Sequence, residues 1–483
     1  MREVKSVLLV GAECAPFAKT GGLADVIGTL PSALKKRGID ARVIMPLHAK
    51  IKEKYRYELY HICSFYVSLG WRNQFVGVET LTYNGIQYYF IDNEYYFGGA
   101  IYKGGEAEGE QYAYFQRAVL EALSLIDFKP DIIHVNDWHT AVIPMLIKTQ
   151  YSCFNDVKTV FTIHNIAYQG RFSPFFVKDL LGISDYYLTS EFMEAYGDAN
   201  FLKAGIVFSD KVNTVSPSYA KELMFPYYSE GMDGVLKKRG EDFCGIINGI
   251  NVDVFNPKND EAISCTYGAG TVSELSGKAK DKTALIKELC LDATAKTPVI
   301  SLVSRLTEQK GIDLIMYALD GLMALGVCFV VLGSGEKRYE DFFRYAAAKY
   351  PGKVSFSGNY DENLSHRIYA GSDIYLMPSK FEPCGISQMI AMRYGTLPVI
   401  RETGGLRDTV TPYNEYTGEG TGFSFANYNA DEMLNTVRIA VEVFNNNKPA
   451  FRKLVKNAMN EDFSFDASAK MYVDLYNKAL NKF

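Results

Sequence analysis

The sequence lacks any apolar run approaching the ~20 residues that a membrane-spanning helix needs. Its first apolar stretch, SVLLVGA, is too short for a signal peptide and leads directly into a glycine-containing turn. No Arg- and Ser-rich transit segment precedes it. We therefore expect no membrane partner and a cytoplasmic location, or a plastid one if a transit peptide has been removed.

An excess of positive charge is also missing, with 51 Lys and Arg against 56 Asp and Glu and a net charge of −5. This balance argues against a nucleic-acid partner, although it leaves room for a local basic pocket. The eight cysteines are scattered, without Cys-x-x-Cys pairs or metal-ligand spacing, which favours reduced thiols. Only 2 Trp accompany 34 Tyr and 30 Phe, which suit either large cores or sugar-binding surfaces.

Short apolar strands alternate with longer helical segments throughout the 483 residues, a pattern typical of βα units and parallel sheets. Two such series predict an α/β protein with two Rossmann-like domains that face each other across a cleft. The strands are expected within residues 6–12, 41–46, 131–137, 159–165 and 211–216, and within 297–305, 327–335, 353–358, 373–379 and 397–400.

The domain boundary is predicted where an apolar strand gives way to the polar stretch after CGIINGINVDVFNPKND, at about residues 245–255. We expect an N-terminal domain over residues 1–247 and a C-terminal domain over 248–462. A final helix over 463–483 has apolar residues at helical spacing and is expected to pack back on the first domain.

The stretch KTGGLADVIG, residues 19–28, follows the first strand. Gly21 and Gly22 let the backbone approach a ligand closely, and the helix that they open attracts anions. Lys19 adds a full positive charge. The residues alone fit equally a cradle for a phosphorylated ligand or a tight turn with a solvated lysine. Asp25 lies one turn into the helix, and its carboxylate would repel a phosphate, so we expect it to face another part of the ligand or an acceptor.

Polar residues also end two later strands of the first domain. In HVNDWHT, His134, Asp137 and His139 fit a hydrogen-bonding wall for a hydroxylated ligand better than a metal site, because no further ligand cluster accompanies them. In TIHNIAYQG, His164 and Asn165 end the next strand, where a structural histidine is the alternative reading.

The second domain repeats this arrangement. Arg305 and Lys310 in SRLTEQKG follow its first strand and suit phosphate oxygens, unless they are a surface basic pair. Glu382 in FEPCGISQ precedes a Cys-Gly turn that opens a helix, where a carboxylate can hold sugar hydroxyls or steady a developing cation. The tetrapeptide TGGL recurs at residues 403–406.

Together, KTGGLADV, HVNDWHT, TIHNIAYQG, SRLTEQKG, FEPCGISQ and RETGGLRDTV resemble the bacterial glycogen synthase and plant starch synthase family, in family order from the first strand to the last helix. The resemblance implies a GT-B fold and a retaining glucosyltransferase that uses ADP-glucose to extend an α-1,4-glucan. It implies no cofactor and no metal. Many retaining GT-B enzymes carry a second glutamate where this chain has Ile390, but this family generally lacks it; the family's usual Trp in the last helix is Phe465 here.

The resemblance also assigns roles to residues. It implies that Lys19, Arg305 and Lys310 bind the diphosphate and that Glu382 holds the transferred glucose. The remaining candidates line the glucosyl, acceptor, adenine or phosphate regions: Gly21, Gly22, Asp25, Asp137, His164, Asn165, Asn248, Tyr360, Cys384, Gly385, Ser387, Thr403, Gly404 and Gly405. Because Lys19 and Arg305 belong to different domains, we expect domain closure to bring both to one diphosphate.

No carboxylate pair suited to a double displacement is readable, so we expect front-face attack, in which the departing phosphate takes the acceptor proton. We take Glu382, His164, Asp137 and Lys19 as the catalytic candidates. The alternatives are a transferase that uses UDP-glucose or another acceptor, and a non-catalytic glucan-binding protein on the same scaffold. The sequence carries no indication of oligomeric state.

Overall fold

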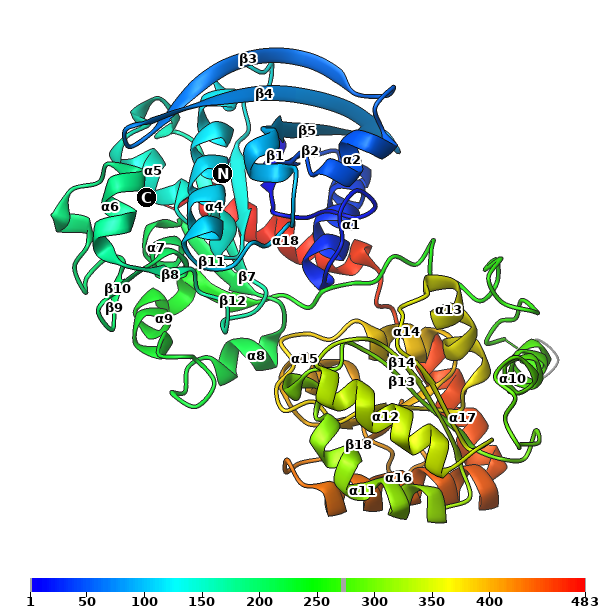
Figure 1. Cartoon of the computed structure of the whole chain (residues 1–483). Coiled ribbons are helices and arrows are strands. Elements are labelled where there is room, and N and C mark those ends of the chain that lie inside the picture. The colour runs from blue at the N-terminus through cyan, green and yellow to red at the C-terminus, as the bar shows by residue number, and fades with distance from the viewer. Residues whose placement is uncertain (1, 271–274, 483) are drawn as a thin grey trace. The chain divides into compact units, whose positions relative to one another are not determined.

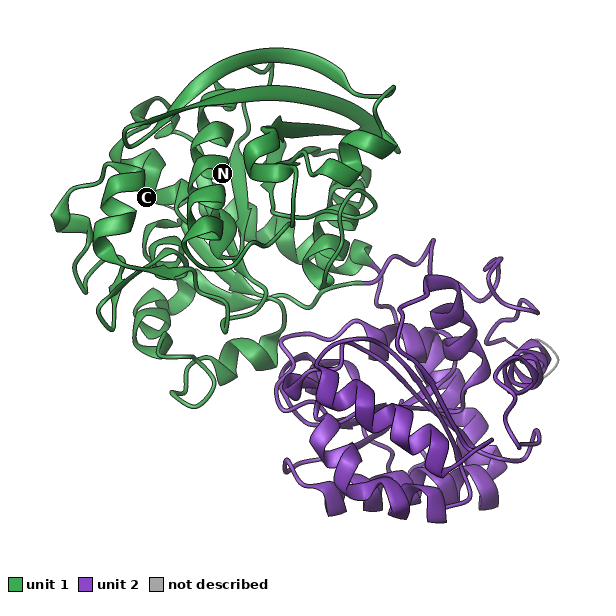
Figure 2. Cartoon of the chain, viewed as in Figure 1, with its two compact units in different colours: residues 1–249, 465–483 green, residues 250–464 purple. Residues whose placement is uncertain are grey.

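The computed structural model describes residues 2–270 and 275–482 and divides into two compact units (Figures 1 and 2). Unit 1 comprises residues 1–249 and 465–483, and unit 2 comprises residues 250–464. The boundaries expected from the sequence, after residues 247 and 462, lie two residues earlier. In the described ranges, no helix is both long and apolar enough to cross a membrane.

Unit 1 is built on a nine-stranded sheet of order β12-β11-β7-β6-β1-β2-β5-β4-β3. From β12 to β5 every neighbouring pair is parallel. The central strands are apolar on both faces because helices cover both sides, so their residues read as continuous hydrophobic runs. The strands are β1 (Ser6–Val10), β2 (Asp40–Pro46), β3 (Tyr60–Leu69), β4 (Arg72–Tyr83), β5 (Ile86–Asp92), β6 (Ile132–Asn136), β7 (Lys158–Ile163), β11 (Lys211–Thr214) and β12 (Phe243–Gly245).

The antiparallel edge of this sheet, β3-β4-β5, is absent from the sequence-based expectation. A readable signal was present: Asn84 and Gly85 join β4 to β5, and both have positive φ, as a tight hairpin turn requires. The alternation of exposed and buried residues in β3 also fits a strand with one covered face. A small second sheet, also unpredicted, contains β8 (Arg171–Phe172), β9 (Glu194–Ala195) and β10 (Asp198–Asn200).

Helices cover both faces of the large sheet and form two cores. One core lies beneath α4 and α5, and the other beneath α1 and the C-terminal α18. The α-helices of unit 1 are α1 (Gly22–Lys36), α2 (Ala49–Lys54), α3 (Glu94–Phe97), α4 (Gly105–Leu123), α5 (Ile143–Thr149), α6 (Pro174–Leu181), α7 (Phe201–Phe208), α8 (Pro217–Glu222), α9 (Asp233–Arg239) and α18 (Phe465–Leu480).

The return of α18 to unit 1 confirms the expectation for the last helix. It packs against α1 and β7, with Tyr472 and Tyr476 fully buried. Phe465 begins the helix, is 3% exposed and belongs to the same core, so an aromatic ring is retained at that position. The hydroxyl of Tyr476 lies 2.8 Å from His134 Nδ1 on β6, which ties the helix to the sheet.

Unit 2 contains an entirely parallel six-stranded sheet of order β15-β14-β13-β16-β17-β18. Its strands are β13 (Val299–Val303), β14 (Cys328–Leu332), β15 (Val354–Ser357), β16 (Ile374–Met377), β17 (Leu397–Arg401) and β18 (Phe423–Phe425). Its helices are α10 (Ser276–Glu288), α11 (Ile312–Ala324), α12 (Lys337–Lys349), α13 (Glu362–Gly371), α14 (Ser387–Arg393), α15 (Gly404–Thr409), α16 (Ala430–Asn446) and α17 (Lys448–Asn460).

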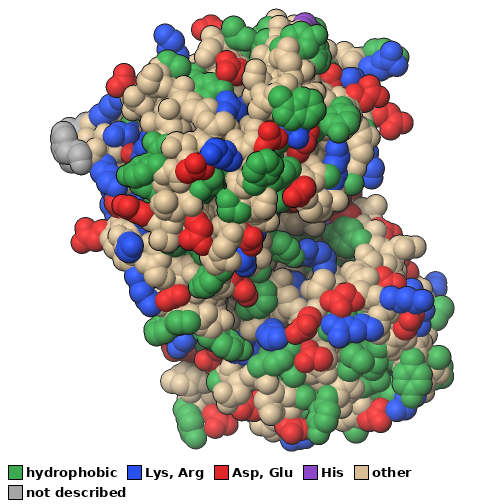
Figure 3. Space-filling model, turned by 60° about the vertical axis from the view of Figure 1, so that its left-hand side comes forward, with side chains coloured by type: hydrophobic (Ala, Val, Ile, Leu, Met, Phe, Trp, Pro, Cys, Tyr) green, Lys and Arg blue, Asp and Glu red, His purple; other side chains and the backbone are tan. Residues whose placement is uncertain are grey.

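All ten strands expected from the sequence are present. Strand order reverses between β1 and β6 in unit 1 and between β13 and β16 in unit 2. At such switch points adjacent loops diverge and leave room for ligands beyond the carboxyl ends of the strands. Positive and negative side chains are interspersed over the face shown in Figure 3, which agrees with the near balance of charges.

Candidate functional site

In unit 2, three loops converge at the switch point between β13 and β16. Gly311 has φ +69°, and a Cβ there would lie 2.0 Å from the carbonyl oxygen of Pro378, so only glycine permits this approach. The backbone of Lys380 donates to Gln309 O at 2.8 Å. Gly405 N donates to Glu382 O at 3.1 Å, which joins the first turn of α15, just after β17, to the loop after β16.

These loops bring Lys310 and Glu382 together. Lys310 Nζ lies 2.6 Å from Glu382 Oε2, and both side chains are largely buried. Ser379 Oγ donates to the same carboxylate oxygen at 3.1 Å. A nearly dry ion pair with a further hydrogen bond is held rigidly, because either charge alone would be costly to bury. The contact joins two residues for which the sequence suggested separate ligand groups.

The other candidates of unit 2 follow strands β13, β15, β16 and β17. Cys384 is 4% exposed, and Gly385 has φ +76° with the Gln388 side chain 2.4 Å from the site of a Cβ. Ser387 begins α14, where its Oγ donates to Met377 Sδ at 3.6 Å. Thr403 is fully buried and precedes Gly404, the first residue of α15. Two candidates lie at the surface: Arg305 and Tyr360 are exposed.

In unit 1, the loop after β1 carries Lys19, whose ammonium lies 2.7 Å from Asp25 Oδ1. The sequence did not predict this ion pair. Asp25 sits in the first turn of α1, which begins at Gly22. A Cβ on Gly21 would have only Glu13 Oε1 nearby, at 3.8 Å, and the φ of Gly21, −158°, suits any residue. Within unit 1, therefore, neither packing nor backbone conformation requires glycine at this position.

Glu13 is a polar residue of this loop that the sequence analysis missed. It is 2% exposed, and its Oε2 accepts a hydrogen bond from Thr20 N at 2.5 Å. Its place in the sequence could have indicated it, because Glu13 is a carboxylate only three residues after the end of β1, at the edge of the sheet where ligands bind. Glu13 contributes to raising the pKa of Asp137, which places the two carboxyl groups in the same region of unit 1.

Asp137 follows β6 in a conformation that is rare for a residue with a Cβ, with φ +55° and ψ 177°. Its Oδ1 accepts hydrogen bonds from the backbone N–H groups of His164 at 2.8 Å and Asn165 at 3.4 Å. Burial nevertheless raises its pKa from 3.8 to about 7. The loops after β6 and β7 are thus joined through a carboxyl group that titrates near neutrality.

His164 is 9% exposed, and burial lowers its pKa to about 3, so the ring is neutral at physiological pH. Its Nε2 lies 2.9 Å from Asn136 Oδ1, and the Asn136 amide nitrogen donates to Val10 O at 3.1 Å. Because an amide oxygen only accepts, Nε2 carries the ring proton and Nδ1 is left as an acceptor. This tautomer can receive a hydrogen bond from a hydroxyl group.

Asn248, near the end of the first segment of unit 1, is 4% exposed. Its Oδ1 is buried and has no hydrogen-bond partner among the described residues. Buried amide oxygens normally accept a hydrogen bond, so the Asn248 oxygen is a candidate to accept one from a ligand hydroxyl.

The first histidine of HVNDWHT does not form part of the expected ligand-binding wall. His134 is fully buried, with Nδ1 on Tyr476 and Nε2 2.6 Å from Thr162 Oγ1, because alternate residues of β6 point into the core under α18. His139 lies 3.4 Å from Glu108 and packs between aromatic rings. The expectation was wrong for His134, and for His139 it stays a prediction. Within residues 2–270 and 275–482, no cluster of three or more His, Cys, Asp and Glu residues is placed to hold a metal ion.

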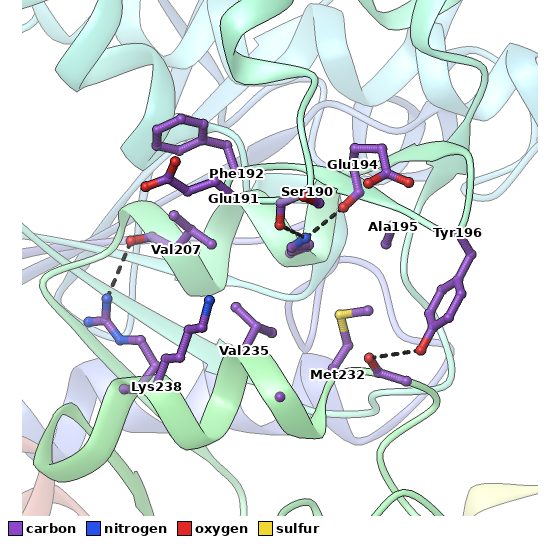
Figure 4. A pocket seen from close by; sticks show the side chains of 14 residues that line it. Ser190, Glu191, Phe192, Glu194, Ala195, Tyr196, Val207, Met232, Val235 and Lys238 are labelled. Carbon is purple, nitrogen blue, oxygen red and sulfur yellow. Dashed lines mark hydrogen bonds between the residues drawn. The ribbon is translucent and has the colours of Figure 1, made fainter.

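Unit 1 contains a cavity next to the loops after β6 and β7, and another that none of the candidate residues lines. A cavity of about 350 Å³ follows β6 and β7 and is lined by Trp138, Tyr168 and Gln169 among others. A second, of about 560 Å³, lies between α7, α9 and residues 190–196 (Figure 4). There Lys203 donates to the carbonyl oxygens of Ser190 and Glu194. None of the candidate residues lines this second cavity.

Residues 6–238 match the family described as "Starch synthase catalytic domain", and residues 291–459 match "Glycosyl transferases group 1". The glycogen synthase of Lachnospira eligens is 49% identical over 98% of this chain and 100% of its own length. The chain belongs to the glycogen and starch synthase family. The glycogen synthase of Clostridium acetobutylicum is similar at 48% identity, with 98% of this chain and 100% of that protein covered.

Structural comparison agrees with membership of the glycogen and starch synthase family. The catalytic domain of starch synthase IV from Arabidopsis thaliana, solved with ADP and acarbose bound, matches with a TM-score of 0.92 at 32% identity, and both chains are covered in full. Sucrose-phosphate synthase from Thermosynechococcus elongatus matches at a TM-score of 0.63, 16% identity and 98% of each chain, which shows the fold alone. The chain is a glycosyltransferase with the GT-B fold, as the sequence predicted.

Proposed function

We propose that this chain transfers glucose from ADP-glucose to the non-reducing 4-OH of an α-1,4-glucan with retention of configuration. The observation that carries the proposal is the Lys310–Glu382 pair at the switch point of unit 2. It offers a cation and a carboxylate side by side, which suits a ligand with an anionic diphosphate next to a hydroxylated sugar. The family relationship and the ADP bound to the Arabidopsis relative support the same donor.

Breaking the bond between C1 and the phosphate oxygen leaves positive charge on the sugar and negative charge on the diphosphate. Lys310, Arg305 and Lys19 are proposed to stabilise the diphosphate as its charge grows. Each such contact contributes about 2–4 kcal/mol if it behaves like a donor to an oxyanion. Glu382 is proposed to hold the glucose hydroxyls and steady the cationic ring, and Tyr360 to stack on the adenine. These side chains take the place of a metal ion.

Retention is proposed to occur without a covalent glucosyl-enzyme. A nucleophilic carboxylate would need a second carboxyl group about 5 Å away across the sugar bond. Glu382 is engaged by Lys310 and Ser379, which lowers its reactivity as a nucleophile. In the proposed step the glucan O4 attacks C1 from the face that the phosphate leaves. The new C1–O4 bond replaces the C1–phosphate bond, and the O4 proton passes to a phosphate oxygen.

Unit 1 is proposed to position the acceptor and the glucosyl group. Neutral His164 can accept a hydrogen bond at Nδ1, and the buried amide oxygen of Asn248 can accept another. Asp137 in the loop after β6 and Asn165 in the loop after β7 are the remaining groups proposed to bind hydroxyls. We propose a cytoplasmic location, because all eight cysteines are free thiols.

The deciding experiment measures release of ADP or UDP when the purified protein is given ADP-glucose or UDP-glucose with maltoheptaose. We expect kcat/KM to be at least about tenfold higher with ADP-glucose, about 1.4 kcal/mol of discrimination. NMR of the early product should show an α-1,4 linkage. Equal rates with UDP-glucose would contradict the donor assignment. Binding of glucan without nucleotide release would favour the non-catalytic alternative.

A further inference from the structure

Among the residues that the structure describes, the outer strand of unit 1 has a strand partner along one edge only, and α6 contacts it, coming close just past its last residue. β3 ends the nine-strand order, and β4 is its single strand partner in that sheet (Figure 1). Cys63, Phe65, Val67 and Leu69 turn toward the core beneath α4. Ser64, Tyr66 and Ser68 alternate with them and are exposed, with Tyr66 65% exposed and its ring against that of Phe75.

The composition of β3 lacks the usual protection of such an edge. Its ten residues, YHICSFYVSL, contain no Lys, Arg, Asp, Glu or Pro. Natural edge strands are commonly short or carry charges, prolines or bulges, which prevent pairing with another chain. One bulge is present between His61 and Cys63, but the seven residues from Cys63 to Leu69 pair with β4 in regular register.

From these observations we propose that β3 is a dimerisation strand, which pairs antiparallel with β3 of a second copy of this chain. A closed two-fold interface uses the same patch on both subunits, so the patch must tolerate its own copy. β3 meets this condition because it places no formal like charges opposite each other. His61 is the one residue of β3 that could carry a positive charge. Its ring already contacts Glu79 at 2.8 Å and Ser64 at 3.1 Å.

The expected dimer is modest in affinity. Seven paired residues extend over roughly 23 Å at ~3.3 Å per residue. Ladder hydrogen bonds and the rings of Tyr66 and Phe75 would hold the subunits together. Such a contact falls below the ~800 Å² per partner of standard interfaces, so we expect dissociation in the micromolar range.

The test is analytical ultracentrifugation of the full-length protein from about 0.5 to 100 μM, a range that spans this expected dissociation constant. We expect a concentration-dependent shift from 54.1 kDa toward twice that mass. Tyr66→Lys with Ser68→Lys should hold the protein at the monomer mass throughout. Tyr317→Lys is the matched control, because Tyr317 is 77% exposed on α11 of unit 2, and it should dimerise like the wild type.

Hydrogen exchange gives an independent readout. Amides of residues 63–69 should exchange more slowly at high protein concentration in the wild type, and this dependence should vanish in the double variant. Unchanged thermal melting and glucosyl transfer would show that the variant is folded. A wild type that stays monomeric to the highest concentration, or a double variant that still dimerises, would overturn the proposal. A wild type that stays monomeric, together with a double variant that no longer binds maltoheptaose, would make this face a carbohydrate-binding surface and overturn the proposal.

Discussion

Lys310 Nζ and Glu382 Oε2 lie 2.6 Å apart at the carboxyl edge of the sheet in unit 2. Lys19 and Asp25 form the corresponding pair in unit 1, at 2.7 Å. In both units, therefore, a lysine proposed to bind the diphosphate contacts a carboxylate of its own unit. Pairing orients each ammonium group, and an incoming anion must share the ammonium with the carboxylate or displace the carboxylate. The two pairs differ in burial, since the Lys310 pair is nearly dry and the Lys19 side chain is 42% exposed.

Replacing Glu382 by Gln should reduce turnover far more than nucleotide affinity. The amide keeps the shape but loses the negative charge that steadies the cationic sugar, so we expect kcat to fall by about 10²–10³-fold. Stopped assays with ADP-glucose and calorimetry with ADP measure the two effects. Glu308→Gln is the control, because Glu308 is an exposed carboxylate on a neighbouring loop. Equal losses in kcat and ADP affinity would count against a glucosyl role for Glu382.

Removing the ammonium of Lys19 should lower kcat/KM for ADP-glucose. We expect a loss of about 10²-fold or more for Lys19→Ala if the lysine stabilises the leaving diphosphate. Asp25→Asn should have a smaller effect, because it removes the partner of Lys19 but keeps the cation. Lys36→Ala, an exposed lysine at the other end of α1, serves as the control and should leave kcat/KM unchanged. An active Lys19→Ala enzyme would remove this residue from the proposed site.

Two glycines of the repeated TGGL motif should respond differently to alanine. A Cβ on Gly405 would lie 2.3 Å from Cys384 O, so Gly405→Ala should lower the melting temperature through backbone displacement. Gly21 has no such contact, so Gly21→Ala should melt like the wild type while raising KM for the donor or acceptor. Differential scanning calorimetry and steady-state kinetics separate the two outcomes. Wild-type kinetics for Gly21→Ala would mean that no ligand approaches this backbone closely.

The stability of unit 1 should depend on pH through Asp137. Its pKa is raised from 3.8 to about 7, so the folded state holds the proton more tightly than the unfolded state. Its contribution to stability is fully present below about pH 4 and is lost as the pH rises through about 7. Asp137→Asn removes this titration, so the wild type should lose more melting temperature than the variant between about pH 5 and about pH 8. Asp185→Asn, at an exposed position, is the control, and parallel melting curves for Asp137→Asn and wild type would refute the prediction.

Local patterns were sufficient for much of the fold. Apolar runs of five or six residues predicted the parallel strands because strands covered on both faces contain few polar residues. The β3–β4–β5 edge was not predicted, because β3 and β4 mix exposed and buried residues and so lack the continuous apolar run of a strand that is covered on both faces. The turn at Asn84–Gly85 was the local signal that would have found it.

The sequence by itself determined the family, the two βα series and the strand ends where polar residues gather, because each is written in short stretches of neighbouring residues. Only the tertiary structure decided which of these residues touch. Lys310 meets Glu382 across 72 positions, and Asp137 joins the loop of His164 across 27. His134 also lies near the carboxyl end of a strand, as Asp137 and His164 do, but its side chain points into the core beneath α18. Strand order and the side-chain direction within each strand set these outcomes, and neither can be read from spacing along the chain.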